Sequence, residues 1–492
     1  MAFGSAAALP EEFSQLSSTL TVSAEELDDY DYRYLDDGTV EIYGCFGSAP
    51  VATIPSQIDG KPVTSIGSYA FNENKYVKKV IIPEGVTNIS EYAFKFCNNL
   101  ETVILPDSLE TIADNAFVCC DSMKDIVLPE GLVSIGESAF EYCESLTEIN
   151  IPSTVKSIGI DAFSGCSSLK SFNIDEDCTI CCSIDGVMYN KDVTKLYLCP
   201  VGKESVTIPE TVNIINVNAF KQCNSIKELT LPESVTDIYE AAFEDCKSLE
   251  TLNIKGTLKN IGNGAFRNCE SLKSIDLKEG LISIDDDAFI GCDSLTYVEL
   301  PSTLEYSGAG IFCACRGLKK VKINMSVYYI NESAFEACTA LESVEIPEGV
   351  TRLCWYAFCS CPSLKSIKLP RSIDNIGFRA LGFDTDEDAR FIDVEGFTIY
   401  GYKDTEAQYY AEENGLNFVD IENMPVRKKG DLNNNGKIDA SDLLQVKSHI
   451  KKVKPLEGDD FDCADVDGNG AINAADLLKM KAHMKGVSDI WA

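Results

Sequence analysis

Histidine and tryptophan are almost absent from this chain of 492 residues, which contains two of each. Both histidines, His449 and His483, lie near the carboxyl end, so the long stretch before them has no imidazole. That stretch cannot form a Ser–His or Cys–His nucleophile pair or a histidine metal site. The chain also lacks the glycine motifs that bind phosphates or dinucleotides. The catalytic arrangement left open is a pair of carboxylates acting on a glycosidic bond.

Basic residues and long apolar runs are scarce as well. The chain has 42 basic and 78 acidic residues and a net charge of -36, which argues against nucleic acid and anionic membranes as partners. No apolar run is long enough to predict membrane insertion. The opening MAFGSAAALP lacks a basic start and a full apolar region, so we expect no complete signal peptide here. Residues 1–33 are interpreted as a poorly ordered leader.

What the chain has in abundance is a repeat. The dipeptide AF, or a close substitute, recurs every 23 residues, except for one step of 57, which is 23 plus 34. Such a period, with Leu, Ile and Phe at fixed offsets, is typical of a solenoid in which each repeat packs on its neighbours. The dipeptides begin at Ala70, Ala93, Ala116, Ala139, Ala162, Ala219, Ala242, Ala265, Ala288, Ile311, Ala334, Ala357 and Ala380.

The repeat SLTEINIPSTVKSIGIDAFSGC, from Ser145, predicts three elements. They are a short parallel strand ending at Pro152, a second extended edge, and a tight turn or short helix whose ring fills the core. Their apolar residues are, in order, Leu146, Ile149 and Ile151; Val155 and Ile158; Ala162 and Phe163. Stacked at a strand spacing of about 4.8 Å, thirteen such units predict a rod roughly 60 Å long with one continuous core. The 34 extra residues, about 175–208, predict a β-hairpin insertion.

Cysteine is frequent, and 21 cysteines in an exported protein would favour disulfides. Eleven of them, however, lie three positions after the repeating Phe, where stacking makes their Cβ vectors parallel and a bridge needs them to converge. We therefore predict a ladder of buried free thiols, ended by Asn74 and Asp384. The ladder contains Cys97, Cys120, Cys143, Cys166, Cys223, Cys246, Cys269, Cys292, Cys315, Cys338 and Cys361. Occasional bridges among the other cysteines stay open, and CTICC at Cys178 lacks the second ligand pair of a zinc site.

The outward positions of the predicted strands are polar and of mixed charge. They include Glu148 and Asn150, Glu228 and Thr230, Thr251 and Asn253, Ser274 and Asp276, Tyr297 and Glu299, and Lys320 and Lys322. Because this face lacks a row of aromatic residues that would stack on sugar rings, it favours a protein ligand over crystalline polysaccharide. The alternative is an ordinary solvated surface.

This repeat pattern resembles the BspA-like class of bacterial leucine-rich repeats, found on surface and secreted proteins that bind host or substrate molecules. The resemblance extends over about residues 34–421, and the flanking segments DDGTVEIYG and GFTIYGYKDTEAQYYAEENGLNFV look like terminal caps. It implies an α/β leucine-rich repeat solenoid with short parallel strands over residues 34–422. It does not identify the macromolecular ligand.

Near the carboxyl end the chain contains a second, unrelated duplication. GDLNNNGKIDASDLLQVKSHIKK from Gly430 returns as ADVDGNGAINAADLLKMKAHMKG from Ala464. Oxygen-bearing side chains lie at loop positions 1, 3, 5, 9 and 12, a glycine lies at position 6, and the carbonyl of position 7 completes a calcium loop. The predicted ligands of two Ca²⁺ ions are Asp431, Asn433, Asn435, Lys437, Asp439 and Asp442, then Asp465, Asp467, Asn469, Ala471, Asn473 and Asp476.

The alternative for these loops is a pair of metal-free turns that cap helices, because Asp and Asn favour both positions. Two full ligand sets at the same spacing favour calcium. An amphipathic helix is expected after each loop, from Leu443, Leu444, Val446 and Ile450 and from Leu477, Leu478, Met480 and Met484. Unlike an ordinary EF-hand, neither loop is preceded by a helical pattern, and position 12 is Asp in both copies.

These departures resemble the type I dockerin of cellulosome-forming anaerobic bacteria, a small α-helical module of two calcium loop-helix (F-hand) repeats. The resemblance covers Gly430 to about Gly486 and implies binding to a cohesin module of a scaffoldin. Carried over position by position, the recognition residues are Ala440, Ser441, Lys447, Ser448 and Lys452, then Ala474, Ala475, Lys481 and Ala482. Because Ser441 is matched by Ala475 and Ser448 by Ala482, two-way binding stays open. The alternative for the lysines is a solvated helix face.

Together these patterns predict a non-catalytic, secreted protein associated with a cellulosome. Residues 34–422 would form the solenoid, 423–429 a linker and 430–492 the dockerin, with the natural signal peptide removed or replaced. Two alternatives stay open, namely an enzyme that uses solenoid carboxylates and a cell-surface adhesin that its tail anchors through a scaffoldin.

Overall fold

A computed structural model describes residues 29–324, 328–385, 390–422, 429–433, 437–452, 456, 463–466 and 472–485. The chain divides into two compact units, residues 1–419 and residues 420–492, which we call the repeat unit and the tail unit. This division falls three residues before the boundary expected after residue 422. No helix within the described ranges is long and apolar enough to cross a membrane.

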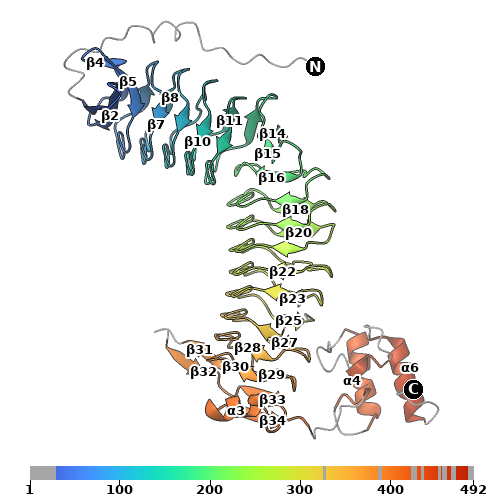
Figure 1. Ribbon diagram of the computed structural model, residues 1–492. Coiled ribbons are helices and arrows are strands. Elements are labelled where there is room, and N and C mark those ends of the chain that lie inside the picture. Colours follow the sequence, from blue (N-terminus) through green and yellow to red (C-terminus); the bar gives the residue numbers. More distant parts are fainter. Residues whose placement is uncertain are drawn as a thin grey trace. The chain divides into compact units, whose positions relative to one another are not determined.

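The repeat unit is a solenoid of about 16 turns, each of which adds a rung to two rows of short strands (Figure 1). Along one row, parallel partners are 23 residues apart, as in Ile89 opposite Ile112. In the amino-terminal half this row consists of β5 (Lys61–Ile66), β7 (Asn88–Ile89), β9 (Thr111–Ile112), β10 (Ser134–Ile135) and β12 (Ser157–Ile158). The other row contains β3 (Val51–Thr53), β6 (Lys79–Ile81), β8 (Thr102–Ile104), β11 (Glu148–Ile151) and β13 (Ser171–Ile174).

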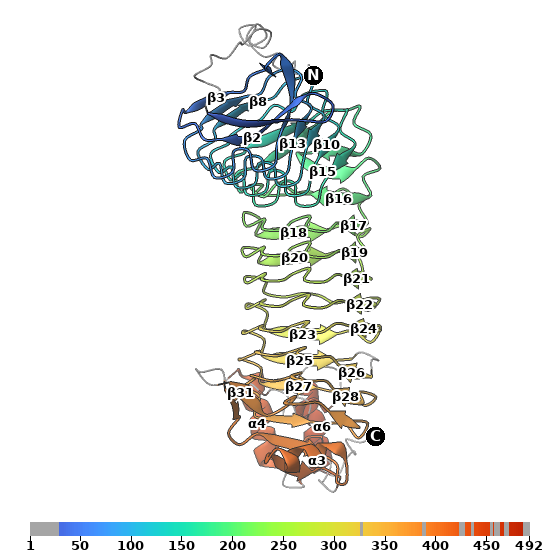
Figure 2. The same ribbon diagram turned by 60° about the vertical axis from the view of Figure 1, so that its left-hand side comes forward.

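The carboxyl-terminal half repeats this arrangement, and the two rows run side by side in Figure 2. The two-residue row consists of β17 (Ile214–Ile215), β19 (Asp237–Ile238), β21 (Asn260–Ile261), β22 (Ser283–Ile284), β24 (Tyr306–Ser307), β26 (Tyr329–Ile330), β28 (Arg352–Leu353) and β30 (Asn375–Ile376). The longer row contains β18 (Glu228–Leu231), β20 (Thr251–Ile254), β23 (Tyr297–Leu300), β25 (Lys320–Ile323), β27 (Ser343–Glu345) and β29 (Ser366–Lys368).

The expected division of a repeat into strand, edge and turn is confirmed. β11 and β12 cover the predicted strand and edge of the repeat at Ser145, and Ala162 and Phe163 lie in a turn. The repeating phenylalanines stack on each other in the core, with ring centroids 4.7 to 5.4 Å apart from Phe71 to Phe163. This distance approaches the spacing between strands, so one ring fills each rung.

A regular backbone feature at each turn was not predicted. Many of the residues just before the Ala-Phe pair, and two after it, have left-handed φ although they are not glycine. Ala241 has a φ of 51° and Asp245 a φ of 57°, on either side of Phe243. Such a conformation costs roughly 1–2 kcal/mol for a residue with a Cβ. It persists because the N–H groups of Ala241, Phe243 and Asp245 all donate to the next rung.

The inserted segment differs from the predicted hairpin and divides the core. β14 (Cys181–Ile184) and β15 (Val187–Asn190) form the expected hairpin, but β16 (Lys195–Leu198) adds a third antiparallel strand and then pairs in parallel with β17. The prediction of one continuous core is wrong, because the buried residues form two clusters that meet at this insertion. Met188 belongs to the amino-terminal cluster, whereas its strand neighbours Val187 and Tyr189 belong to the carboxyl-terminal one.

Both ends of the solenoid are covered. β1 (Tyr30–Tyr34) pairs antiparallel with β2 (Val40–Cys45), and β4 (Gln57–Ile58) pairs with β5. The leader predicted to end at residue 33 is therefore too long, because Tyr30–Arg33 are already paired. Residues 1–28 lie outside the described residues. At the other end lie β31 (Phe383–Thr385), β32 (Phe391–Asp393), β33 (Thr398–Gly401), α3 (Glu406–Glu413) and β34 (Asn417–Asp420).

The tail unit contains two helices of equal length, α4 (Ala440–Ile450) and α6 (Ala474–Met484), each of which follows one predicted calcium loop. Asp439 and Asn473, at loop position 9, act as N-caps. Their side chains accept hydrogen bonds from backbone N–H groups of the first helical turn. A small core, separate from the two of the repeat unit, consists of Leu432, Leu443, Val446, Leu456, Cys463, Ala464, Val466 and Met480.

Candidate functional site

Asp442, at position 12 of the first loop, holds that loop together. Its side chain is fully buried, and its two carboxylate oxygens accept hydrogen bonds from the backbone N–H groups of Asn433 (3.1 Å) and Asp439 (2.9 Å). Ser441 donates its hydroxyl to Asp439 Oδ1 at 2.7 Å and accepts from Asn433 Nδ2 at 2.5 Å. Ligand positions 3, 9 and 12 are therefore linked within one loop.

Asp476 has the same role in the second loop. It is also fully buried, and it accepts hydrogen bonds from the backbone N–H groups of Val466 (2.9 Å) and Asn473 (2.8 Å). The two loops thus share one internal arrangement, as the duplication in the sequence implies. Ala475 stands where Ser441 stands in the first loop, so the serine hydroxyl contacts have no counterpart here.

The burial of these carboxylates fits a cation. Asp431 and Asp465, at position 1, are 1% and 7% exposed, and the two position-12 aspartates are 0% exposed. Removing an ionised carboxylate from water is costly unless a charge or a metal compensates it. Clustered carboxylate, amide and carbonyl oxygens are the ligands that Ca²⁺ prefers. The donor chemistry of both loops therefore fits calcium.

The structure brings together only part of each predicted ligand set. Asp431, Asn433, Lys437, Asp439, Asp442, Asp465, Asn473 and Asp476 are described, whereas Asn435, Asp467, Asn469 and Ala471 lie outside the described residues. Within the described residues, no three His, Cys, Asp or Glu side chains form a metal-binding group. A calcium loop also relies on Asn side chains and a backbone carbonyl, which such a grouping does not include.

The residues carried over as cohesin contacts lie on the outer sides of the two helices. Exposed members are Ala440, Ser441, Lys447, Lys452, Ala474, Ala475 and Lys481, and half-buried members are Ser448 and Ala482. Sequence reasoning missed a matched pair beside them, Leu444 and Leu478, which are 64% and 70% exposed. They were assigned only to the amphipathic pattern, although helical spacing places Leu444 on the same side as Ser441 and Ser448.

The two histidines lie at the same position of the two helices and are half-buried. His449 accepts a hydrogen bond at Nδ1 from the backbone N–H of Leu456, at 2.8 Å. Leu456 belongs to the core of the tail unit, so this bond ties the segment after α4 to that core. His449 therefore has a structural contact.

The polar face of the long strand row is confirmed. Glu228, Asn253 and Tyr297 are exposed while the residues between them face the core. Glu299 is the centre of a cluster on this face, accepting hydrogen bonds from Lys322 (2.8 Å), Tyr297 (2.8 Å) and Asn324 (2.7 Å). These contacts, led by Lys322, lower the pKa of Glu299 to about 2. This carboxylate is thus held ionised and hydrogen-bonded, and would be a poor general acid.

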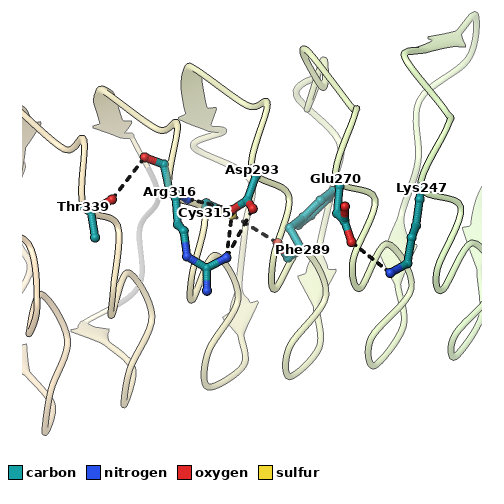
Figure 3. Close-up of polar contacts among 7 residues, drawn as sticks. All are labelled: Lys247, Glu270, Phe289, Asp293, Cys315, Arg316 and Thr339. Atoms are coloured by element: carbon teal, nitrogen blue, oxygen red, sulfur yellow. Dashed lines mark hydrogen bonds and ion pairs between the residues drawn. The ribbon is translucent and has the colours of Figure 1, made fainter. Parts of the chain in front are cut away.

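The eleven-residue cysteine ladder has the predicted form. Each ladder cysteine is a buried free thiol, and ten of them donate to the carbonyl of the phenylalanine 26 residues earlier, as Cys315 does to Phe289 at 3.1 Å (Figure 3). The exception, Cys223, follows the insertion and faces the carbonyls of Cys199 and Pro200. Burial raises the pKa of Cys97 to about 12. These thiols are therefore structural and weakly nucleophilic.

Charged residues beside the ladder connect successive rungs. Figure 3 shows Lys247 paired with Glu270 at 3.0 Å, Arg316 paired with Asp293 at 3.2 Å, and Thr339 donating to the carbonyl of Arg316 at 3.5 Å. Because these pairs are largely exposed, each contributes only about 0–1 kcal/mol. In the insertion, Cys178 and Cys181 lie with sulfurs 3.8 Å apart, and no metal-binding group forms around them among the described residues.

Two rows of parallel strands at a 23-residue spacing, with a stacked phenylalanine in most turns, define a leucine-rich repeat solenoid, here joined to a small helical module. The chain belongs to the family of BspA type leucine rich repeat regions, which matches residues 64–184, 197–319 and 260–385, more than half of the chain. Residues 429–485 match the type I dockerin domain. Both are non-catalytic modules and support a protein-interaction role of the cellulosome type.

Solved structures support the solenoid fold. A leucine-rich repeat protein from Bacteroides ovatus is 25% identical, covers 80% of this chain and 99% of its own, and has a TM-score of 0.52. A leucine rich cell surface protein from Faecalibacterium prausnitzii is 23% identical over 78% of this chain and 95% of its own, with a TM-score of 0.47. The curated proteins contain no match.

Proposed function

We propose that this protein is a non-catalytic interaction protein whose tail unit binds two Ca²⁺ ions and, in that form, a cohesin module of a scaffoldin. The observation that carries the calcium proposal is the pair of fully buried aspartates, Asp442 and Asp476, each of which binds two backbone N–H groups of its own loop. The hydrogen bonds fix the carboxylate orientation, and bound calcium would supply the positive charge that offsets their burial.

Calcium would also complete the two helices as a binding surface. With each loop folded around its ion, α4 and α6 present exposed Ser441 and Lys447 on one side and Ala475 and Lys481 on the other. Exposed Leu444 and Leu478 supply apolar area at the centre of each face, of the kind that partner proteins bury. The serine and its hydroxyl contacts make the first face the more polar of the two, so we propose that it is the preferred cohesin contact.

The repeat unit is proposed to recognise a protein or other macromolecule outside the cell. Its strand face is polar and carries paired charges, such as Lys320 with Glu345 at 2.6 Å. Charged groups on a partner can exchange with such pairs, which favours electrostatic selection of a macromolecule. The tail would then place this recognition surface in a cellulosome.

Calorimetric titration of the full chain with calcium, followed by titration with a panel of type I cohesins, tests this function. We expect two calcium sites and cohesin binding that is lost in chelator and restored by calcium. Asp442→Ala and Asp476→Ala should each remove one site, whereas Asp276→Ala, at an exposed position of the strand face, should remove none. Calcium binding that survives both tail substitutions would contradict the proposal, as would cohesin capture without calcium.

A further inference from the structure

The joint between the two halves of the solenoid contains a pocket of about 440 Å³. One wall is β12 with the turn that follows it, another is the insertion, and the third is the turn after β17. The residues that matter most for its chemistry are Ile158, Ile160, Asp161, Phe163, Tyr197 and Val217. All of them belong to the repeat unit.

The hydrogen-bond ladder of the solenoid is interrupted at this pocket. In a regular rung the N–H groups of Ser138 and Phe140 donate to Ile160 and Ala162 of the next rung, and Gly159 donates back to Ile135. One rung later the pattern stops, because β12 pairs with β10 and with no later strand of the described residues. Within the described residues, the N–H groups of Asp161 and Phe163 and the carbonyls of Lys156 and Ile158 have no backbone partner.

The opposite wall shows the complementary gap. The carbonyl of Val217 corresponds to that of Ile160, which accepts from Ser138, but no N–H of the described residues donates to Val217. The side chain of Asn218 donates to Asp161 Oδ1 at 2.7 Å, across 57 residues of sequence, and joins the two walls at one point. The walls are thus held together where one regular rung would have linked them along the backbone.

Apolar side chains are also left uncovered here. Ile158 is half-buried, whereas the equivalent residues of its own row on either side, Ile135 and Ile215, are 2% and 0% exposed. Ile160 is 62% exposed. Ile180, Tyr197 and Leu198 of the insertion are only partly buried against the core. The pocket therefore combines an incomplete apolar lining with an unpaired strand edge.

We propose that this pocket binds an extended peptide segment of a partner protein, which adds as a strand along β12. Alternating N–H and carbonyl groups at the edge of a strand are matched by another polypeptide backbone, and alternate side chains of that peptide enter the apolar lining. A purely apolar ligand would leave the four backbone groups on this wall unpaired, at a cost of about 1–3 kcal/mol for each buried group. This inference rests on the proposed role of the repeat unit in recognition and assigns a site to it.

Selection from a library of random octapeptides on the full chain, with calcium present, tests the proposal. The best peptide is then synthesised with and without N-methyl groups on alternate amides, and its binding is measured by fluorescence anisotropy. We expect methylation on the register that donates to β12 to reduce affinity at least tenfold. Ile160→Trp, which fills the pocket, should reduce binding similarly, whereas Glu240→Trp, at the equivalent exposed position of a later rung, should leave it unchanged.

Equal binding of methylated and unmethylated peptides would overturn the proposal in favour of an apolar pocket. Failure to select any peptide that distinguishes the native chain from Ile160→Trp would also overturn it. Cohesin capture by the tail unit is measured in parallel, and so is capture of a macromolecular ligand by Ile160→Trp. If both persist, the proposed function stands and only the peptide site fails.

Discussion

The repeat unit and the tail unit bury different things. The repeat unit stacks apolar side chains and thiols turn after turn, so that Phe266 contacts a phenylalanine on each side, with centroids 5.0 and 5.1 Å away. The tail unit has a core of eight buried apolar residues and also buries four aspartates. A stack of repeats gains stability from each neighbour, whereas a module of this size with buried carboxylates depends on a cation. The difference teaches that one chain can contain two folds with separate sources of stability.

The sharpest way to break this comparison is to remove calcium. A chelator should unfold the tail unit and reduce cohesin binding below detection, because the loop carboxylates then repel one another without a compensating charge. The thermal transition of the repeat unit should stay nearly unchanged. Calorimetry and circular dichroism of the full chain, with and without chelator, measure both. Cohesin capture by the chelated protein, or joint melting of the two units, would show that the comparison is wrong.

Thiol reactivity sharpens the same contrast residue by residue. Cys463 is buried in the core of the tail unit, whereas the ladder cysteines are buried in the repeat unit. Chelation should therefore make Cys463 react with a thiol reagent at least tenfold faster and leave the ladder unreactive until denaturant is added. Mass spectrometry of the labelled peptides distinguishes them, with half-buried Cys119 as an internal reference. Rapid labelling of Cys269 in the native protein would contradict the buried ladder.

Within the repeat unit, removal of one stacked ring should have the largest effect. Phe266→Ala should destabilise the solenoid by about 3–5 kcal/mol, because it removes a buried ring between two others and leaves a cavity. Tyr239→Ala, at a partly exposed position, should cost about 0.5 kcal/mol or less. Urea unfolding followed by circular dichroism measures both. Calcium affinity should be unchanged in Phe266→Ala, and a loss would mean that the two units are coupled.

The two faces of the tail unit offer a finer comparison. Ser441→Arg combined with Lys447→Ala should weaken cohesin binding about tenfold, or about 1.4 kcal/mol. The matched change Ala475→Arg with Lys481→Ala should cost about twofold, since the second face lacks the serine hydroxyl. Titration calorimetry at saturating calcium provides both values. Equal losses, or equal tolerance, would favour two-way binding.

The smallest effect concerns pH and the strand face. Because hydrogen bonds lower the pKa of Glu299 to about 2, its contribution to folding is present above pH 4.5 and is lost as the pH falls toward 2. Glu299 is partly exposed, so solvent screening limits this contribution to about 1 kcal/mol or less. Glu299→Gln should flatten the acid dependence of the repeat unit's stability between these values. An unchanged slope in acid urea titrations would show that the cluster is not stabilising.

Much of this architecture could be predicted from local spacing. The 23-residue period predicted the strands at Glu148–Ile151 and Ser157–Ile158 and placed Cys315 beside the chain of Phe289, because each repeat meets its neighbours in the same way. In the tail, spacing alone separates loop from helix. It could not separate Leu443 from Leu444, which are adjacent in sequence, yet one is 7% exposed and the other 64%.

The sequence by itself determined the repeat, its strand register, the thiol ladder and the two acidic loops, because each depends on side chains at fixed short intervals. Only the tertiary structure decided where the core divides, since Met188 joins one cluster while Val187 and Tyr189 join the other across the same strand. It also decided that Ala241 and Asp245 adopt left-handed φ, which hydrogen bonds to the next rung maintain against their Cβ atoms. Long-range contacts of this kind leave no local pattern, because their partners lie one rung away in space.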